Sequence, residues 1–287
     1  MYPVDRIIPL IFSKEQYTDR FGEPNALVDM NPSMRIDKDG QITLLVRRVN
    51  YRKYADKRFS LGSYPSESKY IIARGEVRNL TRWDVTPLRV DYGVSTYPSY
   101  WKGPEDIRFT TDNRIIVTIP ECNPTGNPAI FRACLDGSVL NYVEPCYPNA
   151  MEKNWMPYTD ENYRLKVVYS VCPFSIKDVG TDTIETIGNN MRELKGYHGS
   201  TNGILFHGEY RLFLVHINRE RTYHRWLLFH PLKKTVQISE EFTFFQHSYI
   251  EFPLSLCEYN GILYVSIGVN DENSYILVMN PPMFSGH

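Results

Sequence analysis

The sequence predicts an all-β fold, a five-bladed β-propeller, from three observations. Helical periodicity is hard to find in the 287 residues, whereas short strands of alternating polarity follow one another. Turns rich in Asp, Asn and Gly separate these strands, as they do in antiparallel sheets. One hairpin pattern also recurs five times, and such a repeat at blade-sized intervals is typical of propellers.

Each copy of the repeat has a short segment that begins with polar residues, a tight turn, and an apolar alternating strand. The leading segments are 31–36, 105–109, 153–158, 200–206 and 252–257. The turns are 37–40, 110–113, 159–162, 207–209 and 258–261, and the strands are 41–48, 114–120, 163–170, 210–216 and 262–268. Apart from the first copy, which carries an insertion, the copies follow at close to the roughly 40–50 residues that a four-stranded blade needs.

Further strands after these hairpins complete four per blade, as in 129–134 and 224–229. A two-sheet sandwich also houses alternating strands, but it has no reason to repeat one hairpin five times with polar residues always leading. We therefore expect one propeller domain over 1–287. The innermost strands of a propeller converge on its axis, so the residues that open each repeat should meet in one funnel, where a site is expected.

Composition excludes several classes of partner. Lys and Arg number 32 against 33 Asp and Glu, and the longest basic run is Lys233-Lys234, which argues against nucleic acid. The acidic, proline-containing start does not resemble a secretory signal, and no apolar run approaches the ~18 residues of a membrane span. Five scattered cysteines without C-x-x-C spacing suit a reduced, cytoplasmic protein. The oligomeric state stays undetermined, and a homo-oligomer remains open.

Aromatic residues reach 14 %, with 21 Tyr, which suits stacking on the apolar faces of sugar rings. The alternative is that tyrosines simply fill strands, which they favour. Four aromatic residues lie close in sequence to the repeat starts and are candidate platforms for a pyranose: Tyr97, Tyr100, Trp155 and Tyr158.

The repeat starts collect an unusual set of polar residues, which Arg47 and His216 join from late positions in their strands. At the starts themselves stand Asn31, Asp106, Arg108, Lys153, Asn154, Ser200 and Asn202. Several cations around one carboxylate match a phosphate or a sugar carboxylate, since Arg offers a planar fork and Lys and His add donors. Alternatively, each is an ordinary solvated residue beside a turn, but their shared register favours a common site.

Asp106 follows Glu105 and is flanked by Trp101 and Pro104, which would partly exclude water and suit a proton donor. It could equally be the structural partner of Arg108. Other chemistries find little support, because the sequence has no glycine-rich phosphate loop, no H-E-x-x-H and no G-x-S-x-G elbow. The seven histidines are spread out, so no metal site is predicted.

These motifs resemble glycoside hydrolase family 130, the inverting β-mannoside phosphorylases and related hydrolases on five-bladed propellers. The likeness runs from about Asn31 to Asp271 and is strongest at the repeat starts. The segment 103–108, Gly-Pro-Glu-Asp-Ile-Arg, is similar to the family's Glu-Asp-Pro-Arg signature, with Ile107 in place of proline. Similar matches are Asn-Pro at 31–32, Leu-Leu-Val-Arg at 44–47, Lys-Asn at 153–154, the strand 211–216 ending in His, and Gly-Val-Asn-Asp at 268–271.

The resemblance implies roles for these residues. Asp106 would be the general acid, while Arg47, Lys153 and His216 would hold inorganic phosphate. The remaining candidates for substrate binding are Asn31, Arg108, Asn154, Trp155, Tyr158, Ser200 and Asp271. Family 43 hydrolases would need a base Asp at the first repeat start, where this chain has Asn31, and that argues against them.

The expected function is therefore that of an inverting glycoside phosphorylase, which moves a glycosyl unit, expected to be mannosyl, between an oligosaccharide and phosphate. Phosphate is a co-substrate, and no other cofactor is expected; oligosaccharide or sugar phosphate would be the partner. An inverting hydrolase stays open, with Glu152 or Glu251 as base. So do a glycosyltransferase that uses a nucleotide sugar and a non-catalytic, lectin-like propeller.

Overall fold

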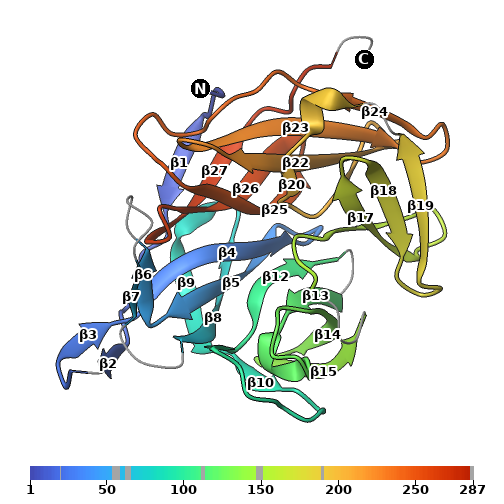
Figure 1. Ribbon diagram of the computed structural model, residues 1–287. Coiled ribbons are helices and arrows are strands. Elements are labelled where there is room, and N and C mark those ends of the chain that lie inside the picture. Colours follow the sequence, from blue (N-terminus) through green and yellow to red (C-terminus); the bar gives the residue numbers. More distant parts are fainter. Residues whose placement is uncertain are drawn as a thin grey trace.

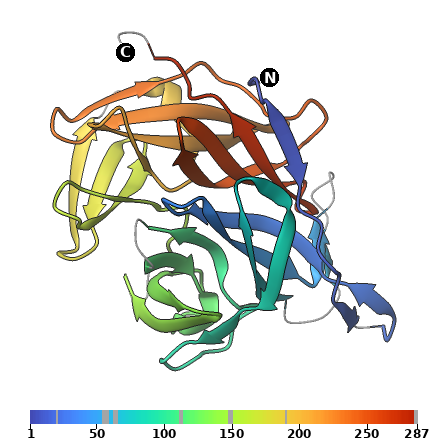
Figure 2. The same ribbon diagram turned by 180° about the vertical axis from the view of Figure 1, so that it is seen from behind.

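The structure, a computed structural model, describes residues 1–19, 21–53, 59–61, 66–110, 114–146, 151–188 and 191–284. Within these ranges it contains strands and two single-turn 3-10 helices, η1 (Pro120–Cys122) and η2 (Arg192–Leu194). Five sheets stand around one axis as the blades of a propeller (Figures 1 and 2). The predicted fold class is confirmed. The described residues contain no helix long and apolar enough to cross a membrane.

Blades I to III follow one another along the chain, and each is antiparallel from its innermost strand outward. Blade I consists of β4 (Val28–Ile36), β5 (Gln41–Val49), β8 (Ser66–Glu76) and β9 (Asn79–Pro87). Blade II consists of β12 (Glu105–Phe109), β13 (Arg114–Thr118), β14 (Ile130–Asp136) and β15 (Val139–Pro145). Blade III consists of β16 (Met156–Thr159), β17 (Leu165–Val171), β18 (Phe174–Asp178) and β19 (Thr183–Gly188).

Blades IV and V complete the circle. Blade IV begins with two short pieces, β20 (His198–Gly199) and β21 (Ile204–Phe206), followed by β22 (Tyr210–Asn218), β23 (Thr222–His230) and β24 (Thr235–Ile238). Blade V consists of β25 (Glu251–Tyr259), β26 (Ile262–Val269), β27 (Asn273–Met279) and, from the start of the chain, β1 (Arg6–Pro9). The N-terminal strand therefore closes the ring by pairing with β27, the last strand of the chain (Figure 1).

The observed hairpins follow the predicted repeat closely. Two details differ: the leading segment of blade IV is interrupted between β20 and β21, and most of the second predicted turn, 111–113, lies outside the described residues. The extra length of the first repeat has two parts. One is the hairpin of β6 (Tyr51–Lys53) and β7 (Phe59–Leu61). The other is a crossing, 88–104, which carries β10 (Arg89–Asp91) and β11 (Trp101–Lys102). A further hairpin, β2 (Gln16–Thr18) and β3 (Pro24–Ala26), projects from the disc (Figure 1).

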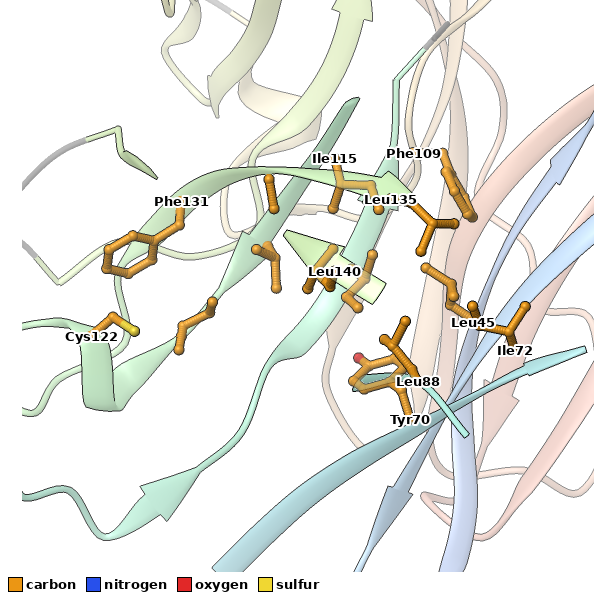
Figure 3. Packing of buried hydrophobic residues seen from close by; sticks show 14 of the residues in the cluster. Leu45, Tyr70, Ile72, Leu88, Phe109, Ile115, Cys122, Phe131, Leu135 and Leu140 are labelled. Atoms are coloured by element: carbon orange, nitrogen blue, oxygen red, sulfur yellow. The ribbon is translucent and has the colours of Figure 1, made fainter. Parts of the chain in front are cut away.

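The hydrophobic core is divided among the interfaces between neighbouring blades. Successive residues of a strand point to opposite faces of its sheet. In β5, Leu44 and Val46 therefore pack against blade V, whereas Leu45 packs against blade II. Figure 3 shows the cluster between blades I and II, in which Leu45 and Ile72 approach Phe109 and Ile115. Because both faces of these strands are buried, their sequences read as nearly continuous apolar runs.

The innermost strands meet around the axis, as predicted. Strand β4 contacts both β12 and β25, and β12 in turn contacts β16 and β25. Residues that are far apart in the sequence but open each repeat are thereby brought to one end of the axis, which we call the entry end.

Candidate active site

A cavity of about 360 Å³ lies at the entry end of the axis. The predicted site residues that line it are Asn31, Arg47, Asp106, Lys153, Asn154, His216 and Asp271. The other lining residues are Met30, Tyr51, Trp101, Glu105, Pro128, Asn218, Ile250, Glu251 and Phe252. All five blades contribute, so the propeller assembles a set that no local stretch of sequence contains.

Four polar residues reach this cavity from strained backbone, and one of them is Asp271 of blade V, with a φ of 52°. Asn31, Asp106 and Asn154 open blades I, II and III with φ angles of 44°, 48° and 61°. This left-handed region is unfavourable for side chains, and Asn and Asp tolerate it best. The pairing register of β4 and of β12 shifts at the same place. Such outliers concentrate at functional sites, where they aim side chains that a regular strand would not.

Blade V makes room for Asn31. A Cβ atom at Gly268 would lie 2.2 Å from Oδ1 of Asn31, so only glycine allows this approach. The Nδ2 group of Asn31 is 3.4 Å from Oδ1 of Asp106, to which it donates a hydrogen bond. Asn31 thus fastens the strained opening of blade II to that of blade I.

Arg47 is the most heavily engaged cation of the cavity. Its side chain is almost fully buried, and Nη2 lies 2.7 Å from Oε1 of Glu105 while Nη1 lies 3.7 Å from Oδ1 of Asp106. Nε donates to Oγ of Ser68 at 2.6 Å. Burial opposes the charge, but Glu105, followed by Tyr51 and Asp106, outweighs it and raises the pKa of Arg47. The guanidinium is therefore a permanent charge that faces the candidate acid.

Arg108 does not line the cavity, which corrects its expected contact with substrate. It is fully buried, its Nε donates to the carbonyl oxygen of Ser200 at 2.7 Å, and its Nη1 donates to that of Asp106 at 3.1 Å. The partner is thus the backbone of Asp106 and not its carboxylate. Burial lowers the pKa of Arg108. The side chain joins blade II to blade IV and supports the strained backbone at Asp106.

His216 reaches the cavity from β22 and is held by Ser200. Its Nδ1 is 2.7 Å from Oγ of Ser200, and the hydroxyl is fully buried. Ser200 therefore orients the His216 ring. It does not line the cavity, contrary to its predicted contact with substrate. Burial, followed by His224, His198 and Arg108, lowers the pKa of His216 well below 6.5. The imidazole is neutral at pH 7, so it offers a hydrogen bond and no charge.

Lys153 and Asn154 line the edge of the cavity where blade III begins. Lys153 is exposed and Asn154 half-buried, and both also line a neighbouring cavity of about 350 Å³. The Lys153 ammonium is thus a solvated cation at the rim, in contrast to the buried Arg47.

The aromatic platforms were predicted wrongly at Trp155 and Tyr158. Trp155 is fully buried between blades II and III, and its Nε1 donates to Oε2 of Glu152 at 3.0 Å. Tyr158 is 4 % exposed and lies at the opposite end of the axis, near Phe213. Nearness in sequence misled here, because Trp155 turns into the interface between two blades and β16 carries Tyr158 away from the entry end.

Other aromatic rings do line the cavity. Tyr51 and Trp101 pack edge to face with centroids 5.7 Å apart, and Phe252 lies on the blade V side. Burial raises the pKa of the Tyr51 hydroxyl to about 12 despite the nearby Arg47, so the hydroxyl stays protonated. Tyr51 belongs to the inserted β6–β7 hairpin, and the length of the first repeat was the sequence signal that could have pointed to it.

The two carboxylates named as candidate bases are engaged by protein donors. Glu251 accepts hydrogen bonds from His224 Nε2 at 3.0 Å and from the backbone N–H groups of Phe244 and Phe245. Burial favours its neutral form, but the donors, led by His224, hold the pKa of Glu251 below its usual value. Glu152 accepts from the Trp155 indole and, at 2.8 Å, from the Tyr169 hydroxyl. Neither is arranged to activate water.

The described residues contain no cluster of three or more His, Cys, Asp or Glu side chains that could hold a metal ion. The cavity brings together two carboxylates on strained backbone, Asp106 and Asp271, with a buried guanidinium, a neutral imidazole and a solvated ammonium. Together they suit proton donation beside an anion.

Comparison with known proteins extends these observations. No protein-family model and no curated protein sequence matches the chain. Among solved structures, a β-1,2-mannobiose phosphorylase from Listeria innocua matches at a TM-score of 0.59 and 14 % identity, covering 94 % of this chain and 97 % of that one.

Two further structures match comparably well. A glycosyl hydrolase from Bacteroides ovatus matches at a TM-score of 0.63 and 13 % identity, covering 96 % of this chain and 91 % of the other. The second structure comes from family 130, whose mannoside phosphorylases include hydrolases of β-1,2 mannosidic linkages in Candida mannan. It matches at a TM-score of 0.61 and 13 % identity, covering 96 % of this chain and 90 % of the other. Identities this low establish fold and not activity. The chain thus shares the five-bladed fold of family 130 mannoside phosphorylases and of related glycoside hydrolases, as its sequence motifs indicated.

Proposed function

We propose that the protein is an inverting glycoside phosphorylase that transfers a mannosyl unit between an oligosaccharide and inorganic phosphate. One observation carries this proposal: Asp106, Arg47, Lys153 and His216 line the same cavity although they come from four blades. A proton donor beside a group of phosphate donors is what phosphorolysis requires. The shared fold with mannoside phosphorylases supports the choice of reaction and of sugar.

The reaction is a single displacement. A phosphate oxygen attacks the anomeric carbon, and the bond from that carbon to the glycosidic oxygen breaks. Asp106 gives its proton to the departing oxygen, directly or through a sugar hydroxyl. The products are a sugar 1-phosphate of inverted configuration and a shortened saccharide. The proton of the attacking hydrogen phosphate then restores Asp106, so no proton is gained or lost.

Arg47, Lys153 and His216 contribute to phosphate binding in different ways. Glu105 already balances one side of Arg47, so the guanidinium contributes direction more than net charge. Lys153 supplies charge from the rim, and neutral His216 supplies a donor through Nε2 when the Ser200 hydroxyl donates to Nδ1. Such placed donors act without reorganising when the transition state forms.

The sugar would occupy the rest of the cavity. Asn31, Asn154 and Asp271 offer hydrogen-bonding groups, and the rings of Tyr51 and Trp101 offer apolar faces. These roles replace the platforms expected at Trp155 and Tyr158.

The test is to incubate the protein with candidate β-mannosides and phosphate, and in reverse with sugar 1-phosphates and acceptors. Phosphorolysis yields sugar 1-phosphate, and the reverse reaction releases phosphate. Free sugar formed equally with and without phosphate would instead identify the hydrolase. Turnover of nucleotide sugars alone would identify a glycosyltransferase, and glycan binding without any turnover would identify a lectin.

A further inference from the structure

Glu121 in η1 is a buried carboxylate that the proposed reaction does not use. The residue is 5 % exposed. Its Oε1 accepts hydrogen bonds from the N–H of Gly103 and from the hydroxyl of Tyr92, both at 2.6 Å. Its carbonyl oxygen accepts from the N–H of Tyr97, also at 2.6 Å. One residue therefore holds the crossing 88–104 near its beginning, in its middle and at its end.

The carboxylate is kept there at an energetic cost. Oε2 of Glu121 is buried and has no hydrogen-bond partner among the described residues. A buried polar atom without a partner destabilises a fold, so its presence calls for a reason. Burial and the bond to Glu121 also raise the pKa of Tyr92, which keeps that hydroxyl a donor.

Gly103, the residue that Glu121 holds, stands three residues before Asp106 in close contact with Ser68. It has a φ of 88°, and a Cβ atom there would lie 1.9 Å from the carbonyl oxygen of Ser68. Just before it, Lys102 pairs with Glu67 in parallel strands. Just after it come Pro104, Glu105 and the strained Asp106. Gly103 and Asp106 are thus separated by only two residues, so a displacement of Gly103 would be passed along a short stretch of backbone to Asp106.

This segment borders a second cavity. The cavity has a volume of about 690 Å³ and is lined by Gly103, Pro104, Ser68 and Glu121. The segment therefore has space into which it can move when its anchor is lost. Ser68, on the same wall, also accepts the hydrogen bond from Arg47.

We infer that Glu121 is a positioning residue, which sets the geometry of Asp106 and of its partner Arg47 through Gly103. This inference rests on the proposed function, in which Asp106 protonates the leaving group. Since catalytic groups must be held within fractions of an ångström, release of Gly103 should slow proton donation while substrate still binds.

The experiment compares two substrates that differ in their need for an acid. With a β-mannosyl disaccharide and phosphate, Glu121→Ala should lower kcat about 10- to 100-fold with little change in KM. With dinitrophenyl β-mannoside and phosphate, the loss should be much smaller, because this leaving group departs without a proton. Glu121→Gln should recover most of the rate, because its amide oxygen can still accept from Gly103.

A matched control is Asp160→Ala. Asp160 is also buried, and its Oδ1 accepts from the N–H groups of Asn162 and Arg164 at 2.9 Å in a turn beyond β16. This variant should lose stability but show no difference between the substrates. Folded Glu121→Ala with wild-type kcat on the disaccharide, or with equal losses on both substrates, would overturn the inference.

Two further measurements keep the result decisive. If Glu121→Ala does not fold, Glu121→Asp replaces it, because its shorter side chain withdraws from Gly103 and should give the same substrate contrast. If the wild type phosphorolyses neither substrate, the proposed function fails. The positioning of Gly103 by Glu121 is then tested by hydrogen exchange, which Glu121→Ala must accelerate at the amides of β12. Unchanged exchange at these amides would overturn the inference.

Discussion

The two ends of the propeller axis differ in chemistry more than in size. The cavity at the far end, about 690 Å³, is larger than the 360 Å³ cavity at the entry end. Its charged residues lie on or beside hairpin turns, such as Asp37 and Glu258, and its walls include Met34 and Leu256. The entry end instead gathers charged side chains from several blades, two of them, Asp106 and Asp271, on strained backbone. The difference teaches that convergent polar groups, and not volume, identify the candidate site.

The largest expected effect is at Asp106. Asp106→Asn should lower phosphorolysis by about 10² to 10⁴, the usual contribution of a positioned proton donor, without lowering Tm. A dinitrophenyl mannoside should be partly rescued, because it needs no proton. Steady-state kinetics and a thermal melt check both statements. A well-folded variant with full activity would show that Asp106 is not the proton donor, and the entry end would then lose its proposed catalytic role.

Tyrosines at the two ends should respond in opposite ways. Tyr158→Ala, at the far end, should destabilise the fold by about 3–5 kcal/mol because it leaves a cavity, with kcat/KM of the folded protein unchanged. Tyr51→Ala, at the entry end, should raise KM for the sugar about 3- to 10-fold through lost stacking. Urea unfolding and kinetics on both variants provide the comparison. A raised KM in Tyr158→Ala would show that the sugar binds in the far cavity.

Acid should lower the stability of the fold through His216, which lies at the entry end. Its pKa is lowered in the fold, so the unfolded chain binds the proton first as pH falls. The stability it contributes is complete above about 6.5, the unfolded value, and is lost below that at up to about 1.4 kcal/mol per pH unit. Denaturation midpoints measured from pH 7 to pH 5 should fall less steeply in His216→Asn. Identical slopes would show that other groups cause the acid sensitivity.

The smallest expected effect is stabilisation by phosphate. Tens of millimolar phosphate should raise Tm by about 1–3 °C through mass action, and Lys153→Ala should abolish most of the rise. The comparison variant is Lys38→Ala, which removes a cation of the far cavity and should leave the rise intact. If Lys38→Ala abolished the rise in Tm and Lys153→Ala did not, the anion site would lie at the far end.

The repeat and the residues at its starts could be predicted because both depend on local signals. Turn residues and alternation mark each hairpin, and a propeller brings equivalent positions together whatever the intervening loops do. This is why Asn31, Asp106 and Asn154 were expected to be neighbours, and they line one cavity. Their catalytic and binding roles stay predictions.

Only the tertiary structure decided which side chains face the axis. Asn154 lines the cavity, whereas Trp155, which directly follows it, packs between blades II and III. Both residues precede β16, and Asn154 has a left-handed φ, so no strand alternation assigns them to a face. Sequence alone could not reveal this, because the direction of each side chain depends on how blades II and III pack together.

Long-range contacts were equally hidden. The sequence shows Glu105 beside Asp106, but the pairing of Glu105 with Arg47 requires blades I and II to be packed together. Likewise Glu121 meets Gly103 only because the crossing 88–104 returns to the axis. The sequence by itself thus determined the blades and the polar composition of their starts. The packing between blades decided which of those groups are paired, buried or open to a ligand, since such contacts join residues that no local pattern relates.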